Sequence, residues 1–118
     1  GERCFDAAEL LARNDGNLEF LGEMKDLLAE DSGRLLTEAG EALDAGDFQR
    51  LARSAHTLKG MVSNFCSEPA LTAASELESA ARQHSVDRST LALAATKRCV
   101  LQLLAELNVF LKSSKAPS

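Results

Sequence analysis

The stretch FQRLARSAHTLKGMVSNFC, residues 48–66, decides the fold class of this chain. Its apolar side chains recur at intervals of three and four residues: Phe48, Leu51, Ala55, Leu58, Val62 and Phe65. On an α-helix this spacing aligns them in one continuous stripe, the pattern of a helix that buries one side. We therefore expect an amphipathic helix from about Phe48 to Cys66.

The same helical period marks segments on both sides of this stretch. The sequence predicts a short helix at 6–13, a long one at about 18–43, one that follows Ser67 through Ala81, and a last one at about 89–112. The last helix should face inward with Leu93, Val100, Leu104, Leu107 and Leu111. Turn-forming residues separate the helices at 14–17, 46–47 and 84–87. Because short connections make consecutive helices antiparallel, we expect an all-α, up-down-up-down four-helix bundle with an additional short N-terminal helix.

Length and composition fit one domain with a packed core, since the chain has 118 residues and 45% of them are hydrophobic. We expect residues 1–118 to form this domain, with 113–118 as a frayed tail. The formal charge is −5, from 13 Lys and Arg against 18 Asp and Glu. This balance argues against binding to nucleic acid or to an anionic membrane surface. No apolar run approaches the roughly 20 residues that cross a bilayer.

The three cysteines, Cys4, Cys66 and Cys99, are odd in number and widely spaced. This usage favours reduced thiols in a cytoplasmic setting over a disulfide framework. The ligand spacing of structural zinc sites does not occur in the sequence. We therefore expect neither a metal site nor a cofactor of the domain's own.

One exposed position of the 48–66 helix stands out. With a helical turn of about 100° per residue, His56 lies roughly 140° from the centre of the apolar stripe, on the solvent side. Lys59 follows at the margin of the stripe, and Gly60 follows one turn after the histidine. The same exposed sector also holds Gln49, Ala52 and Ser63. Because a mid-helix glycine costs stability, its lack of bulk indicates room beside the imidazole for a partner or a substituent.

A displayed histidine with these neighbours suits phosphoryl transfer. Neutral imidazole is a nucleophile at physiological pH and can attack phosphorus. Because the adduct is anionic, the ammonium group of Lys59 is a suitable charge partner for it. A helix also fixes the ring better than a loop would. From this pattern by itself, however, an inert surface histidine is the commoner explanation.

Residues 55–60, AHTLKG, resemble the A-H-x-L-K-G signature of histidine-containing phosphotransfer domains. The family's L…L-E…R continuation on the next helix is resembled by Leu71, Leu77, Glu78 and Arg82. The resemblance implies that His56 is the phosphoacceptor, that Lys59 neutralises the phosphoryl group and that Gly60 gives steric access. It also implies that receiver domains donate and accept the phosphoryl group, each with an aspartate and a Mg²⁺ ion. The domain itself would then have no ATP-dependent kinase activity.

The resemblance also predicts the setting of the domain. We expect the receiver to dock on Gln49, Ala52, Arg53 and Ser63. We further expect a cytoplasmic domain, either free-standing or at the C-terminal end of a hybrid sensor kinase whose parent chain can be membrane-anchored. Since one chain supplies all four helices, a monomer is expected.

Three other functions remain open from the sequence. A helical module that docks receivers or other signalling partners without accepting phosphate would keep its output when His56 is replaced by Gln. An autonomous enzyme is disfavoured, because no glycine-rich phosphate loop, metal-ligand cluster or Ser/His/Asp or Cys/His constellation is found. The dimerisation part of a sensor kinase would need two chains to complete its bundle.

Overall fold

The computed structural model describes residues 3–115 and is helical throughout, with no strand in that range. Five α-helices follow one another: α1 (Ala7–Arg13), α2 (Leu18–Asp44), α3 (Phe48–Val62), α4 (Glu68–Arg82) and α5 (Val86–Lys115). One turn of 3₁₀ helix, η1 (Ser63–Phe65), extends α3. No helix among these residues is long and apolar enough to cross a membrane.

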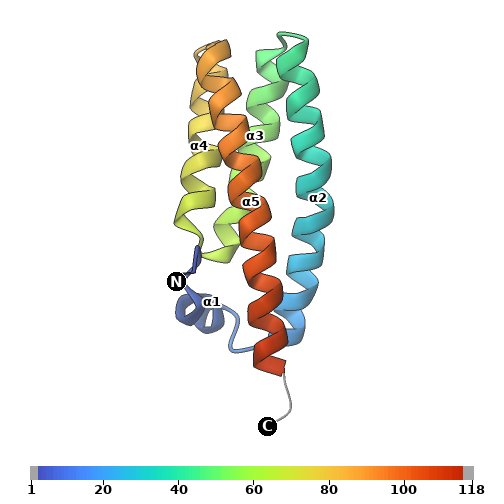
Figure 1. The fold of residues 1–118 in the computed structure, drawn as a ribbon, viewed down its shortest axis with the longest axis vertical. Coiled ribbons are helices and arrows are strands. Elements are labelled where there is room, and N and C mark those ends of the chain that lie inside the picture. Colours follow the sequence, from blue (N-terminus) through green and yellow to red (C-terminus); the bar gives the residue numbers. More distant parts are fainter. Residues whose placement is uncertain (1–2, 116–118) are drawn as a thin grey trace.

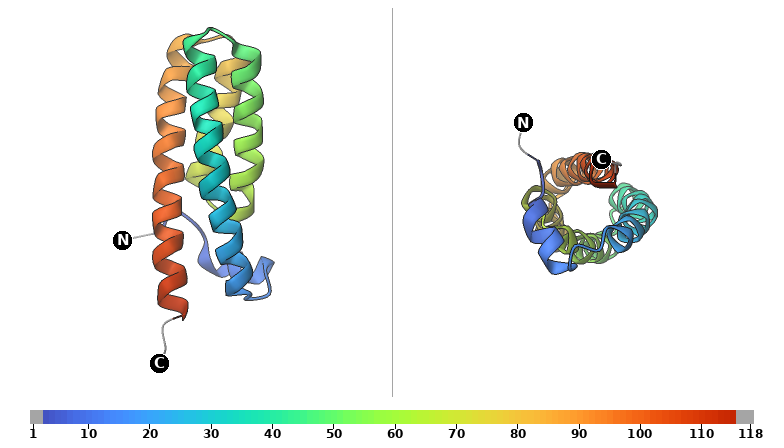
Figure 2. Two further views of the ribbon diagram at one scale, coloured as in Figure 1. Left: turned by 90° about the vertical axis from the view of Figure 1, so that its right-hand side faces the viewer. Right: turned by 90° about the horizontal axis from the view of Figure 1, so that it is seen from below.

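Helices α2 to α5 form an up-down-up-down four-helix bundle, and α1 lies against its lower end (Figure 1). The main contacts join α2 to α3, α3 to α4, α4 to α5 and α5 back to α2. The view along the bundle in Figure 2 shows the resulting ring, in which α3 and α5 lie diagonally opposite each other. The expected fold class, including the short N-terminal helix, is confirmed.

The helix boundaries follow from capping side chains. The carboxylate of Asp47 accepts a hydrogen bond from the backbone N–H of Arg50 at 3.1 Å and so begins α3. Gly46, just before it, has a φ of +69°, a left-handed conformation that glycine adopts without steric cost. Ser67 caps α4 in the same way through the backbone N–H of Ala70. The predicted turn at 46–47 and the predicted start of a helix after Ser67 are therefore confirmed.

Two predicted boundaries were wrong by a few residues. Helix α3 ends at Val62 rather than at Cys66, because η1 tightens the last turn and Cys66 then turns left-handed, with a φ of +55°. Helix α5 begins at Val86 rather than at Ser89, because the hydroxyl of Ser85 accepts a hydrogen bond from the backbone N–H of Arg88 at 3.2 Å. Residues 113–115 continue α5, and residues 116–118 lie outside the described part of the chain.

The core divides into two clusters along the bundle. The lower cluster holds buried side chains from all five helices, and the large ones include Leu10, Leu28, Leu58 and Leu103. The upper cluster is built mainly from alanines: Ala39, Ala42, Ala52, Ala55, Ala81 and Ala92, with Leu51 and Leu77. Of the residues expected to face inward on α5, Leu93 and Leu104 are only partly buried. Small side chains in the upper cluster let α3 and α4 approach closely, and the candidate site lies along this pair.

Candidate functional site

One nearly buried carboxylate, that of Glu78 on α4, organises the site. Its side chain is 9% exposed, and its Oε1 atom accepts a hydrogen bond from Nζ of Lys59 at 2.9 Å. Its Oε2 atom lies 3.1 Å from Nδ1 of His56. Oε2 also accepts hydrogen bonds from Nη2 of Arg82 at 2.6 Å and from Nε of Arg82 at 3.1 Å. Glu78 therefore joins His56 and Lys59 of α3 to Arg82 of α4.

The local sequence explains why these groups meet. His56 and Lys59 are three residues apart on α3, and Glu78 and Arg82 are four residues apart on α4, so each pair shares one side of its helix. Alanine contacts in the upper cluster then bring the two sides together across the α3–α4 interface. The site thus depends on two rigid helices rather than on a loop.

The two cations set the ionisation state of Glu78. Hydrogen bonds from Lys59 and then from Arg82 outweigh the effect of burial and lower the pKa of Glu78 from 4.5 to about 2. The carboxylate is therefore ionised at neutral pH. An ionised carboxylate can only accept hydrogen bonds.

This ionisation fixes the tautomer of the histidine. Because Oε2 of Glu78 can only accept, Nδ1 of His56 must carry the proton that it shares with the carboxylate. In the neutral ring, Nε2 then bears the free lone pair. The side chain of His56 is 65% exposed, so this nucleophilic nitrogen belongs to a ring that a partner can reach. The arrangement is able to accept an electrophilic phosphoryl group on Nε2.

The charges around the imidazole favour an anionic adduct. Lys59 and Arg82 carry two positive charges beside the single negative charge of Glu78. Their side chains are 35% and 63% exposed, respectively, so both remain partly open to solvent. A phosphoryl group on His56 would therefore enter a region with a local excess of positive charge.

Gly60 lies on the exposed side of α3, one turn after His56. Apart from its two chain neighbours and the nearby backbone of its own helix, a Cβ atom built at this position would meet no described atom within 4 Å. Packing within the described part of the chain therefore does not require glycine here. The free space lies outside the helix, where a partner that approaches the imidazole would need it.

The four expected docking residues fall into three different environments. Gln49 and Arg53 are exposed and line a groove between α3 and α4 that His56 also lines. Ala52 was expected to be exposed, but it is only 7% exposed, because α4 covers it with Leu77 and Ala81. It forms part of the groove's floor. Ser63 is exposed but lies in η1, where its hydroxyl donates a hydrogen bond to the carbonyl of Gly60.

Two aromatic rings, one from the start of α3 and one from the α4–α5 connection, line the same groove. The imidazole of His84 stacks on the ring of Phe48, with centroids 5.1 Å apart and planes inclined by 8°. His84 has a left-handed backbone, with a φ of +54°, in the turn after α4. The side chain of His84 is exposed, but its stacking on Phe48 holds it in place.

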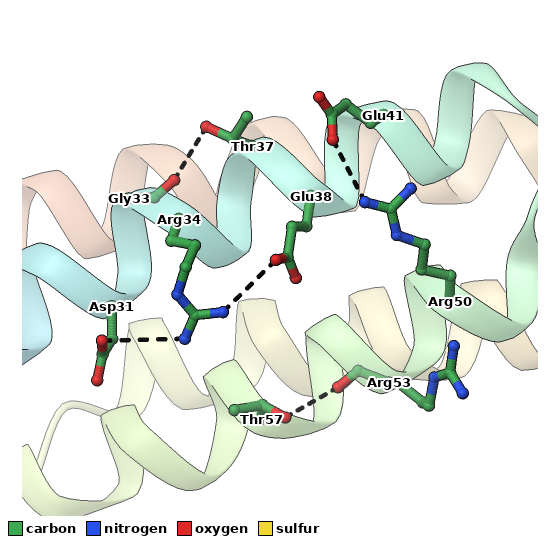
Figure 3. Close-up of polar contacts among 9 residues, drawn as sticks. All are labelled: Asp31, Gly33, Arg34, Thr37, Glu38, Glu41, Arg50, Arg53 and Thr57. Carbon is green, nitrogen blue, oxygen red and sulfur yellow. Dashed lines mark hydrogen bonds and ion pairs between the residues drawn. The ribbon is translucent and has the colours of Figure 1, made fainter.

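On the other side of α3, acidic side chains of α2 form ion pairs with arginines (Figure 3). Arg34 pairs with Asp31 at 3.9 Å and with Glu38 at 3.5 Å. Arg50 of α3 reaches across to Glu41 at 3.3 Å. Arg53 has no ion-pair partner within residues 3–115, so its charge is free for an external group.

The roles of Glu78 and Arg82 were not predicted from the sequence, although both residues were part of the family resemblance. The sequence did contain a signal for the burial of Glu78. It follows Leu77 on the apolar side of α4, and the other buried residues of that helix are alanines. A carboxylate in such a position needs a cationic partner. Arg82, one turn later, supplies one, and Lys59 supplies another from α3.

Comparison with known sequences identifies the family. The family model described as Hpt domain matches residues 23–109, and the chain therefore belongs to this family. The resemblance carried by residues 55–60 is thus confirmed. Membership supports a phosphocarrier function in phosphorelays and interaction with two-component signalling proteins in general. None of the curated protein sequences matches this chain significantly.

Two solved structures share the fold. Histidine-containing phosphotransfer protein B from Pseudomonas aeruginosa PAO1 superposes with a TM-score of 0.85 at 23% identity, over 96% of this chain and 98% of that one. A histidine-containing phosphotransfer protein from maize superposes with a TM-score of 0.75 at 20% identity, over 96% of this chain and 85% of that one. At these identities the similarity establishes the four-helix fold.

Proposed function

We propose that this domain accepts a phosphoryl group on Nε2 of His56 from the aspartyl phosphate of one receiver domain and passes it to the aspartate of another. The observation that carries the proposal is the hydrogen bond from Nδ1 of His56 to ionised Glu78, which leaves the lone pair on Nε2 of an exposed ring. Family membership supports the same function.

The chemistry is a reversible substitution at phosphorus. The lone pair of Nε2 attacks, a P–N bond forms, and the P–O bond to the receiver's aspartate breaks, so that the carboxylate leaves with the bond's electrons. Because Nδ1 keeps its proton, the ring of the adduct is cationic, and Glu78 stabilises it through the 3.1 Å contact. Attack by a second aspartate on the same phosphorus reverses the steps and restores neutral His56.

The remaining site residues interact with the phosphoryl oxygens or leave space for the receiver to reach His56. Lys59 and Arg82 offset the negative charge of the adduct, and Gly60 leaves room for the receiver's active site. The Mg²⁺ ion expected in such a transfer would be bound by the receiver. The transferred group comes from an acyl phosphate, so the domain needs no kinase activity of its own. A cytoplasmic domain, free-standing or fused to a hybrid sensor kinase, suits this role.

The test is phosphorylation of the purified domain by a phosphorylated receiver, or by a small phosphoramidate, followed by intact mass. We expect a gain of one acid-labile phosphoryl group, which His56→Gln abolishes. His84→Gln is the matched control and should keep the gain, since His84 stacks on Phe48, whereas it is His56 that contacts Glu78. Absence of phosphorylation with several competent donors would leave the non-phosphorylated docking module as the function.

A further inference from the structure

The groove between α3 and α4 continues past His56 toward the α2–α3 and α4–α5 connections. Ala52 and Ala81 lie in it, and their small side chains leave a recess of about 880 Å³ between the two helices. The stacked rings of Phe48 and His84 line its far end. A recess of this size is in the range of sites that hold several groups of a ligand rather than a single ion.

Both walls of the groove carry positive charge. Arg53 lies on the α3 wall and makes no ion pair within residues 3–115. Arg82 lies on the α4 wall, and its side chain is 63% exposed although it pairs with Glu78. Among the described residues that line the groove, Asp47 is the one carboxylate, and it accepts a hydrogen bond from the backbone N–H of Arg50. On a chain with a net charge of −5, this groove is therefore a place where an anionic partner is favoured.

The position of His56 identifies the partner that covers the groove. Because the imidazole of His56 itself lines the groove, a receiver that brings its aspartyl phosphate to Nε2 must lie over the adjoining part of the recess. The aspartyl phosphate and the carboxylates that hold Mg²⁺ make the approaching surface acidic. The charges of the groove are complementary to such a surface.

We propose that the α3–α4 groove is a docking subsite for an acidic segment of the receiver, beside the receiver's phosphorylated aspartate. Carboxylates of that segment form ion pairs with Arg53 and with the exposed part of Arg82. This inference rests on the proposed function and adds to it the surface beside His56 on which the partner docks. The competing surface lies on the α2 side of α3, where Leu27 and Met61 help to line a mostly apolar hollow.

Substitutions at Gln49 test the charge of the groove. Its side chain is exposed and lines the groove, and within residues 3–115 no hydrogen bond joins it to the His56–Glu78 site. With a phosphorylated receiver at subsaturating concentration, Gln49→Lys should raise the transfer rate about threefold and Gln49→Glu should lower it about threefold. Both differences should be clear at about 50 mM salt and should shrink at about 500 mM, because ions screen exposed charges. The receiver used is one that phosphorylates the unsubstituted domain.

Ala29→Lys and Ala29→Glu are the matched controls. They change the net charge of the chain by the same amounts, at an exposed position of α2 that does not line the groove. Both should transfer at the rate of the unsubstituted domain. Gln49 lies in the first turn of α3, where an acidic side chain suits the helix dipole. Slower transfer by Gln49→Glu therefore cannot result from a weakened helix.

Phosphorylation by a small phosphoramidate distinguishes docking from the chemistry at His56. Its rate should be the same in the Gln49 variants as in the unsubstituted domain. If the Gln49 variants change this rate as much as the receiver rate, the groove binds small anions and the proposal is overturned. If they change neither rate at low salt, the receiver docks on the α2 side of α3. That result also overturns the proposal, but phosphorylation of His56 would still support the phosphocarrier function. Absence of phosphorylation with both donors would overturn the phosphocarrier function and this inference with it.

Discussion

Nδ1 of His56 lies 3.1 Å from Oε2 of Glu78, whose side chain is 9% exposed, while the imidazole itself is 65% exposed. The contact therefore joins the nucleophilic ring of His56, which a partner can reach, to the carboxylate of Glu78, which is nearly buried. Hydrogen bonds from Lys59 and then from Arg82 lower the pKa of Glu78 and keep its carboxylate ionised. The result is a histidine with a defined tautomer and a fixed ring, displayed on the surface of a rigid bundle.

Glu78→Gln should slow phosphoryl acceptance by about tenfold, equivalent to about 1.4 kcal/mol in the barrier. The amide oxygen can still accept a hydrogen bond from Nδ1, but it no longer offsets the positive charge that develops on the ring. The rate is measured with one receiver donor at saturating concentration. Glu76→Gln, on the same helix and paired with Arg88, is the control and should transfer at the normal rate. Equal rates for the two variants would show that Glu78 has only a structural role.

The stability of the domain should depend on the ionisation of Glu78 at acid pH. Its pKa is lowered to about 2 in the folded state from 4.5, so its ionic contacts stabilise the fold above about pH 4.5 and are lost as the pH falls toward 2. The two cationic side chains are partly exposed, so we expect Glu78→Gln to lower the free energy of unfolding by about 1–2 kcal/mol near neutral pH. Denaturant unfolding of both proteins at several pH values checks this. The difference should shrink in acid; a constant difference would mean that packing of Glu78, not its charge, stabilises the fold.

Much of the fold could be predicted because α3 and α4 carry clear local signals. The 3.6-residue stripe from Phe48, the cap at Asp47 and the cap at Ser67 each act within a few residues. The end of α3 was misplaced because Cys66 adopts a left-handed conformation that glycine usually supplies. The predicted start of α5 was three residues too late. Ser85 caps the helix, but its first turn, which begins at Val86, has no apolar stripe that would have indicated a helix.

The site could be predicted only where its residues share one helix. His56, Lys59 and Gly60 follow from helical geometry, whereas the contact with Glu78 depends on how α3 and α4 pack. The burial of Ala52 also depends on how α3 and α4 pack, because α4 lies over this side chain. Interactions between helices depend on the distance and register at which the helices pack. The hydrophobic period of a single helix determines neither.

Lys59→Ala should reduce the rate of phosphoryl transfer or shorten the lifetime of the adduct. The substitution removes the ammonium group that would offset the phosphoryl charge, and it removes the hydrogen bond that contributes most to the lowered pKa of Glu78. Both quantities can be followed by the decay of the phosphorylated mass. Lys97→Ala, an exposed lysine on α5, is the control and should change neither. An unchanged rate and lifetime for Lys59→Ala would mark Lys59 as a structural partner of Glu78 alone.

Arg53→Glu should weaken docking of the receiver without altering the chemistry at His56. The guanidinium is exposed in the groove beside the imidazole and has no ion-pair partner among the described residues, so its charge is available to a partner. We expect transfer from a receiver to fall about tenfold at subsaturating concentrations, since one rim charge contributes mainly to association. Phosphorylation by a small phosphoramidate should not change. A loss with both donors would place Arg53 in the chemistry of the site rather than in docking.

Gly60→Ala distinguishes an effect on the stability of the fold from an effect on the receiver's access to His56. Apart from its chain neighbours and the nearby backbone of α3, a Cβ at this position meets no described atom within 4 Å. The variant should therefore gain up to about 1 kcal/mol in the free energy of unfolding, the ordinary difference between alanine and glycine in a helix. Transfer from a receiver should nevertheless slow, because the added methyl group occupies the approach to His56. Gly33→Ala is the matched control, since it lies inside α2 and is equally unobstructed. It should gain similar stability and transfer normally. If Gly60→Ala is stabilised and its transfer rate is unchanged, the glycine does not serve access, and the partner must approach the imidazole from the α4 side instead.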